Sequence, residues 1–234
     1  MLMKYKPVLL IIGLLIVVAG IVMAAMTGVS VTAGTQSRWA GGATGNIITQ
    51  AGNITNVNIS GTVLTSKWAD FYGNVSGTIV LSNGSISGSG VVYSWTYNTS
   101  GSAKGVCLTE NSSWISSSAP VAATGANIDT VYGFTGTDAD SGMNTYNTSS
   151  CSFVMDSGTI NSCGNVTLKG NSTFNDCVIG NGGNTANNYG NLAFCTPINA
   201  TGKNYINSSY NYEVMVPIQP PGTSGTYYFY AELS

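Results

Sequence analysis

The stretch WADFYGNVSGTIVLSNGS, residues 68–85, decides the fold class of this chain. Its apolar residues alternate with small polar ones, and this period of two is typical of a β-strand with one buried face. Two N-x-[ST] glycosylation sequons, at Asn74 and Asn83, flank the alternation beside turn residues, where a glycan would leave the edge of a sheet. The side chains that we expect to face the core are Val75, Ile79 and Leu81.

The same alternation recurs through the rest of the chain. It is clearest in VVYSWTY (91–97), YEVMVPI (212–218) and YYFYAEL (227–233). Turn signals such as SNGS, GNGGN and QPPGTSG separate such runs at short intervals, and no stretch beyond residue 46 has the convincing pattern of an amphipathic helix. We therefore predict a mainly β protein in which residues 47–234 form one glycosylated, antiparallel β-sandwich domain.

The N-terminal residues have a different character. Lys4 and Lys6 precede an apolar run, residues 7–26, that is long enough to cross the hydrocarbon core of a bilayer. Because basic residues precede this run and almost none follow it, the remainder of the chain is expected outside the cell. Residues 1–26 are predicted to form a hydrophobic α-helix that acts as an anchor, a filament core or a signal, and we favour retention over cleavage. Residues 27–46, small and nearly uncharged, are predicted to be a linker or a donated strand.

Charged residues make up only 7% of the chain, where soluble domains have roughly a quarter. Seven basic and nine acidic residues, without a basic cluster, exclude nucleic acid as a partner, because phosphate binding needs clustered positive charge. A surface so poor in charge needs another source of solvation, and covalent N-glycans would supply it. The candidate glycosylation sites are Asn53, Asn58, Asn74, Asn83, Asn98, Asn111, Asn147, Asn165, Asn171, Asn199 and Asn207.

Five cysteines follow the apolar segment, and each is a disulfide candidate: Cys107, Cys151, Cys163, Cys177 and Cys195. In an oxidising compartment this number predicts two disulfides with one thiol left over. We expect Cys163 to pair with Cys177, which would close a short loop. A zinc site is disfavoured, because the chain has no histidine and no C-x-x-C spacing.

The sequence indicates no enzyme. Without histidine there is no Ser-His-Asp or Cys-His arrangement, and no spacing singles out a pair of catalytic carboxylates. In TGTDADSGMNTYN (135–147), Asp138, Asp140 and Asn144 alternate around a glycine. We favour a turn capped by Asp side chains, with a weak Ca²⁺ site as the alternative. No other metal or cofactor is expected.

Two parts of the chain resemble a known group of proteins. KWADFYGNVSGTIVLSNGS (67–85) and the aromatic strand YSWTY that follows it resemble a motif of exported archaeal cell-surface proteins. CSFVMDSGTI (151–160) and the two last alternating runs are similar in style to the closing strands of those proteins. The resemblance covers roughly residues 60–115 and, more loosely, 150–234, and it implies an exported surface protein with no catalytic residues to carry over.

An apolar N-terminal helix before a glycosylated β-domain is also similar to the organisation of archaeal type IV pilins. Pilins carry a basic and a small residue directly before the helix, whereas Lys6 is followed here by Pro7. Threads and bundling pili, whose β-domains join through donated strands, resemble it too. We expect a structural subunit of an extracellular archaeal surface assembly, a pilus-like filament that self-associates as a homopolymer, with its helix in the membrane or the filament core. The alternative is a membrane-tethered glycan-binding adhesin or an S-layer-associated module.

Overall fold

The computed structural model describes most of the chain beyond the apolar segment. The described residues are 27–39, 46, 48, 50–83, 90–97, 104–114, 120–155, 158–169, 174–181, 189–219 and 223–233. The predicted helix over residues 1–26, like the sequons at Asn98 and Asn171, lies outside them. Within the described ranges, no helix is both long enough and apolar enough to span a bilayer.

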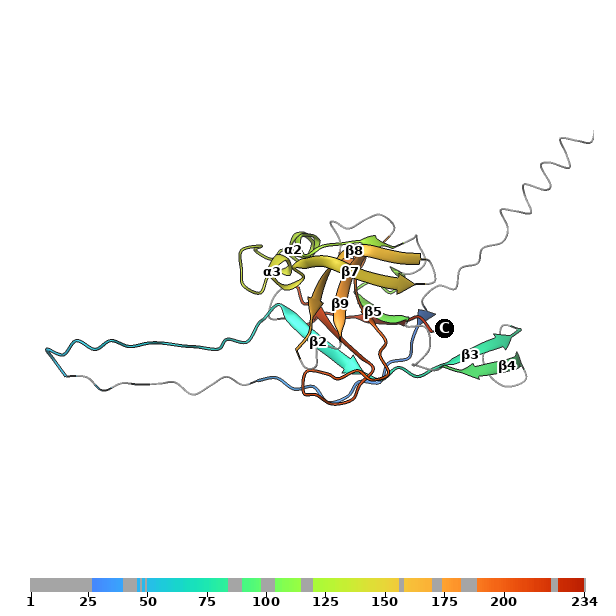
Figure 1. Ribbon diagram of the computed structural model, residues 1–234, viewed down its shortest axis with the longest axis horizontal. Helices are drawn as coiled ribbons and strands as arrows, with labels where there is room; N and C mark the ends of the chain where they lie inside the picture. Colours follow the sequence, from blue (N-terminus) through green and yellow to red (C-terminus); the bar gives the residue numbers. More distant parts are fainter. Residues whose placement is uncertain are drawn as a thin grey trace, which may run out of the picture.

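The described residues are mainly antiparallel β-structure, as predicted (Figure 1). One sheet has eight strands, in the order β1-β12-β5-β10-β9-β8-β7, with β6 paired to β9. Its strands are β1 (Thr27–Gly28), β5 (Gly105–Thr109), β6 (Val121–Ala122), β7 (Thr148–Met155), β8 (Gly158–Thr167), β9 (Asn175–Gly180), β10 (Leu192–Pro197) and β12 (Tyr228–Ala231). Two further pairs are β2 (Trp68–Gly73) with β11 (Tyr212–Pro217) and β3 (Thr78–Ser82) with β4 (Val91–Thr96).

One face of the large sheet is covered by the β2–β11 pair and by helix α2 (Gly125–Tyr132). Leu108 and Phe194 from the sheet pack in one cluster with Val214 from β11 and Ile128 from the helix. A four-residue helix, α3 (Gly142–Thr145), lies against α2, and a 3₁₀ turn (Tyr189–Asn191) precedes β10. This cluster is the larger of the two buried cores.

The expectation that no amphipathic helix follows residue 46 is wrong, because α2 is one. Its start is stabilised by the Asn127 side chain, whose Oδ1 accepts a hydrogen bond of 2.9 Å from the backbone N–H of Thr124. Its end is set by Gly133, whose φ of 65° is the left-handed conformation that glycine adopts readily. The eight residues between these two signals are too few for a strong periodic pattern.

On the other face of the large sheet, its strand β7 folds over towards its strand β5. In the strand order β7 and β5 are separated by three strands, yet the Phe153 ring of β7 lies directly over Gly105 of β5. A Cβ atom at Gly105 would lie 2.2 Å from that ring, so the close approach needs glycine. The sheet is therefore curled, and its inner face encloses a second core that contains all five cysteines.

The cysteines form two disulfides with one thiol left over, as predicted. The expected pairing of Cys163 with Cys177 is wrong: Cys177 is bonded to Cys151, and Cys163 is free and buried. The other bond joins Cys107 on β5 to Cys195 on β10, which are directly opposite in the ladder. The expected pair would have closed a short loop, whereas strand order brings together residues 88 apart.

The expected core positions in β3 also need correction. Val75 packs against the larger core, but the side chains of Ile79 and Leu81 are 36% and 55% exposed. The β3–β4 hairpin extends away from the body of the fold (Figure 1), and the exposure of Ile79 and Leu81 shows that, among the described elements, none buries its apolar face. Alternation identifies the apolar face of a strand but does not show whether another element packs on it.

We expect the Cys107–Cys195 disulfide to contribute strongly to stability, because it closes a long loop. Changing both residues to alanine should lower the free energy of unfolding by about 4 to 5 kcal/mol in the chain-entropy model. Denaturant unfolding of the oxidised protein measures this loss, with Cys163→Ala as the matched control that removes a buried sulfur without removing a bond. Equal losses in the two variants would contradict the prediction.

Candidate functional site

An extended arm is the first surface feature that the fold itself does not explain. Residues 50–64 have exposed side chains throughout and no regular secondary structure. In Figure 1 this segment runs far out from the body of the fold. Ile54, Ile59 and Val63 are 102%, 91% and 90% exposed. Single exposed apolar residues are ordinary on a protein surface. Several exposed apolar side chains in one segment that does not pack on the core are typical of a surface that binds a partner.

The base of the arm is fixed by the loop that the sequence singled out as a candidate Ca²⁺ site. Lys67 Nζ lies 2.8 Å from Asp138 Oδ2 and 2.7 Å from Asp140 Oδ1, and Thr65 Oγ1 donates to Asp140 at 2.8 Å. The same ammonium group lies 5.5 Å from the centre of the Phe134 ring. Both carboxylates are thus already paired with the same cation of the chain, and a divalent ion would have to displace it.

Asn144 does not complete a cation site either. Its Nδ2 group, a hydrogen-bond donor, points at the backbone oxygen of Asp138 at 2.7 Å. The loop is a capped turn, but the cap is Ser141, whose Oγ accepts from the backbone N–H of Asn144 at 3.2 Å. The predicted caps, the Asp138 and Asp140 side chains, bind Lys67 and Thr65 instead. Sequence reasoning missed the role of Lys67, which is separated from its partners by more than seventy residues.

The second surface feature is the outer edge of the large sheet, where the N-terminal segment meets β12. Thr27 and Gly28 pair with Ala231 and Tyr230, and Val29 N–H donates to the backbone oxygen of Phe229 at 3.3 Å. Residues 27–46 were predicted as a linker or a donated strand, and their first residues are a strand added to this edge within the same chain. Among the described residues, Thr27, Gly28 and Val29 carry this pairing, so the described part of the N-terminal segment covers a short length of the edge.

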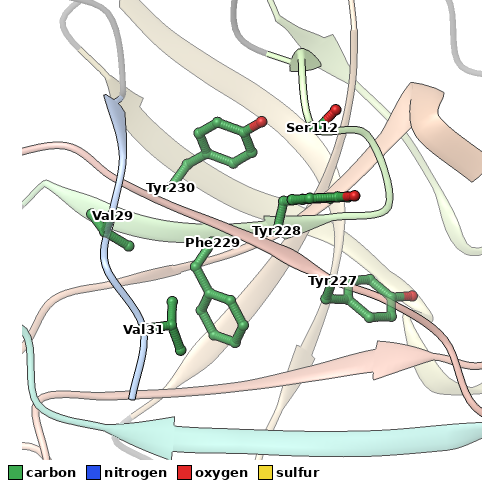
Figure 2. A pocket seen from close by; sticks show the side chains of 7 residues that line it. All are labelled: Val29, Val31, Ser112, Tyr227, Tyr228, Phe229 and Tyr230. Atoms are coloured by element: carbon green, nitrogen blue, oxygen red, sulfur yellow. The ribbon is translucent and has the colours of Figure 1, made fainter. Parts of the chain in front are cut away.

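A shallow pocket of about 390 Å³ lies along this edge (Figure 2). It is lined by residues of three segments: Val29, Val31, Ser112, Tyr227, Tyr228, Phe229 and Tyr230. Figure 2 shows Val31 beside the Phe229 ring. Val29 and Val31 remain 39% and 52% exposed, so this part of the N-terminal segment is held at the surface rather than buried in the core.

The floor of the pocket is rigidly held. Tyr230 Oη donates to the backbone oxygen of Asn111 at 3.0 Å, and Tyr227 Oη lies 3.1 Å from Tyr132 Oη. The Phe229 ring packs edge-on against Phe71, with 5.4 Å between the ring centres. The pocket contains no charged side chain among its described lining residues, so it suits an apolar or backbone-pairing partner.

The candidate glycosylation sites differ in how the structure presents them. The exposed candidates are Asn53, Asn58, Asn74, Asn83, Asn147 and Asn207, and the half-buried ones are Asn111 and Asn199. Asn165 is only 5% exposed, and its Nδ2 donates to Asn175 Oδ1 at 2.8 Å. Since a glycan is attached to this nitrogen, Asn165 is unsuited as a site in the folded chain.

Three carboxyl groups meet between β2, β11 and β9, a grouping that no sequence spacing indicated. Asp70 and Glu213 lie within hydrogen-bonding reach. Although the Asp70 residue as a whole is exposed, partial removal of its carboxyl group from water, together with Glu213, raises the pKa of Asp70 to about 8. Burial also raises the pKa of Glu213 and, more strongly, that of Asp176, whose Oδ2 accepts from the backbone N–H of Met215 at 2.8 Å. When Asp70 is protonated, its carboxyl group can donate a hydrogen bond to the Glu213 carboxylate. This hydrogen bond is lost when Asp70 loses its proton.

The aromatic side chains divide between core and surface. Trp68 and Tyr146 stack in the larger core, with 5.8 Å between ring centres, and Trp114 is buried in the inner one. Tyr93 and Trp95, on the projecting hairpin, are 58% and 49% exposed with their ring centres 4.7 Å apart. These two rings are therefore a possible contact surface of their own.

We expect Asp70→Asn to flatten the pH dependence of stability. Because the folded chain binds the Asp70 proton more tightly than the unfolded chain, this group's contribution is fully present below pH 4 and is lost as the pH rises through about 8. The melting temperature of the variant should therefore fall less than that of the wild type between pH 5 and 8. Asp140→Asn is the contrast, since Lys67 lowers the pKa of Asp140 and this variant should lose stability at neutral pH. Identical pH profiles for wild type and Asp70→Asn would contradict the prediction.

The comparisons with known proteins give no relative to argue from. No family model matches the sequence, and neither a curated protein nor a solved structure matches it. The features from which a function can be inferred are therefore the arm, the edge at β12, the sequons and the apolar N-terminal segment.

Proposed function

We propose that this protein is a structural subunit of an extracellular archaeal surface assembly, a pilus-like filament built as a homopolymer. The observation that carries the proposal is the arm, residues 50–64, whose apolar side chains have no partner within the described part of their own chain. A segment with this composition is stabilised when it packs on, or pairs with, another subunit. No enzymatic activity and no cofactor is part of the proposal.

The edge at β12 supports self-association through strands. Residues 27–29 of the same chain already pair with this edge. We propose that a longer strand from a neighbouring subunit can pair with the rest of the edge. Arms on neighbouring copies are the available donors, because their β-branched residues favour an extended conformation. The β-domain itself is proposed to act as a β-sandwich, with β2–β11 as its smaller layer.

The apolar segment, residues 7–26, is proposed to lie in the membrane before assembly or in the filament core after it. Its side chains, mostly Leu, Ile and Val, each contribute about 1.5 to 3 kcal/mol when they leave water. Small residues at several positions allow neighbouring helices to approach closely. The retained helix, the extracellular β-domain and the donated strand thus belong to one proposal.

N-glycans are proposed to solvate this surface, and Asn74 and Asn83 are the best candidates. Both are exposed, each directly after a strand, and a glycan there would also block unwanted pairing at the strand edges. Glycopeptide mass spectrometry on material from the producing cells should find added mass at these two sites and none at the buried Asn165. Unmodified peptides at every sequon would contradict the glycan proposal.

We expect a charge in the arm to prevent assembly. Val63→Asp in the full-length chain should remove filaments from the material that sediments from detergent-free buffer, because burying an unpaired carboxylate at a subunit contact is unfavourable. Ile206→Asp is the matched control, since Ile206 is also exposed, at 57%, but lies outside the arm. Negative-stain imaging of the pellets should show filaments for wild type and control.

Two outcomes would contradict the filament. One is disordered aggregates from the wild-type chain, and the other is assembly by Val63→Asp at the wild-type level. A membrane-bound monomer on cells would favour the alternative, a membrane-tethered glycan-binding adhesin or an S-layer-associated module. The exposed Tyr93–Trp95 pair supports that alternative, because aromatic faces stack on sugar rings; Trp95→Ala would then abolish binding to polysaccharide.

A further inference from the structure

The inner face of the large sheet holds one thiol directly beside a disulfide. The Sγ atoms of Cys151, Cys163 and Cys177 all lie within 4.8 Å of one another. Cys151 and Cys177 are bonded, whereas Cys163 is free and fully buried. The Cys163 thiol also donates to the backbone oxygen of Cys151 at 3.4 Å. A free thiol is thus held within reach of both sulfurs of an existing bond.

The backbone favours more than one pairing among these three sulfurs. Cys151 and Cys163 are directly opposite each other in the β7–β8 ladder, and the ladder register shifts on both sides of Cys151. Ser162, next to Cys163, has a φ of 65°, which is unusual for a residue with a side chain. Cys177 faces Asn165, two residues along β8 from Cys163 and therefore on the same side of the strand. Neither alternative bond requires a strand to change its place in the sheet.

We propose that Cys163 is an internal nucleophile that exchanges with the Cys151–Cys177 disulfide, so that the three pairings interconvert within the folded chain. Cys163 loses its proton to solvent, and the thiolate attacks Cys151 Sγ. The Cys163–Cys151 bond forms as the Cys151–Cys177 bond breaks, and Cys177 leaves as a thiolate that takes up a proton. Attack on Cys177 releases Cys151 in the same way. One disulfide replaces another, so no oxidant or reductant is consumed.

The exchange changes what the disulfide holds. A Cys151–Cys177 bond ties β7 to β9 across β8, whereas a Cys151–Cys163 bond closes the β7–β8 hairpin on itself. In the second state the contact of Phe153 with Gly105 has no covalent support from β9. The position of the free thiol therefore determines how firmly the curl of the sheet is closed. This inference does not depend on the proposed filament.

The reaction is slow at neutral pH and accelerates with alkali. Burial raises the pKa of Cys163 to about 11, so little of it is thiolate near pH 7. The side chains packed around it in the inner core are apolar or disulfide-bonded, and Tyr230 is the other titratable residue among the described members. Exchange should therefore become about tenfold faster with each pH unit between 7 and 10.

Disulfide mapping of the full-length protein tests the exchange. Samples incubated at pH 7, 8.5 and 10 are quenched with acid, digested with pepsin and analysed for linked peptides by mass spectrometry. We expect Cys151–Cys163 or Cys163–Cys177 peptides to accumulate at a rate that rises with pH, while Cys107–Cys195 persists. The control Cys163→Ser should keep Cys151–Cys177 alone at every pH. A single unchanged pairing in the wild type at pH 10 would overturn the proposal.

Trapped variants test the geometry independently of rate. Cys177→Ser should fold with a Cys151–Cys163 bond, and Cys151→Ser with a Cys163–Cys177 bond. Neither should then have a thiol that an alkylating reagent labels after denaturation without reductant, whereas the wild type should have one. Folded variants that each label at two thiols would show that the alternative bonds cannot form, and would equally overturn the proposal.

Discussion

The contact between the Phe153 ring and Gly105 holds the large sheet in its curled shape. It joins β7 to β5 over three intervening strands, and it exists because position 105 has no side chain. The curl encloses the inner core, in which Trp114 is only 2% exposed and the five cysteines are buried. A side chain at position 105 would have to displace the Phe153 ring and the nearby backbone of Thr196, which would disturb the packing of this core. The larger core, between the sheet and the layer formed by β2, β11 and α2, lies on the opposite face of the same strands.

The few charged residues of this chain serve structure more than solubility. Lys67 bridges two aspartates at the base of the arm, and Lys104 lies 3.3 Å from Glu232, whose side chain is only 4% exposed. Charges used in this way are not available to solvate the surface. The surface instead presents Asn, Ser, Thr and Gly, which explains why hydration would have to come from attached sugars.

The period of two predicted the β-class and the strands β2, β3, β4, β11 and β12, because alternation is a local property of each run. It did not identify β5, β9 and β10, which are buried almost throughout and so do not alternate. What it could not predict depends on contacts between distant segments. Ile79 and Leu81 have the pattern of core residues, but their side chains are exposed because the hairpin that carries them does not pack against the body of the fold. The pairing of Asp70 with Glu213 likewise depends on β2 lying beside β11, and no spacing along the chain encodes that register. Helix α2 is so short that its local signals are limited to the Thr124–Asn127 capping box at its start and Gly133 at its end.

The Cys107–Cys195 bond also sets how the chain responds to mechanical load. A force that pulls on the two ends of the β-domain passes from β5 to β10 through this bond and bypasses the residues between them. With a sequence separation of 88, the bond withholds about 300 Å of contour length from extension. Under tension the load passes through the segments on either side of the bond, β2 and β11 among them, whereas α2, α3 and strands β6 to β9 stay outside the path of the force.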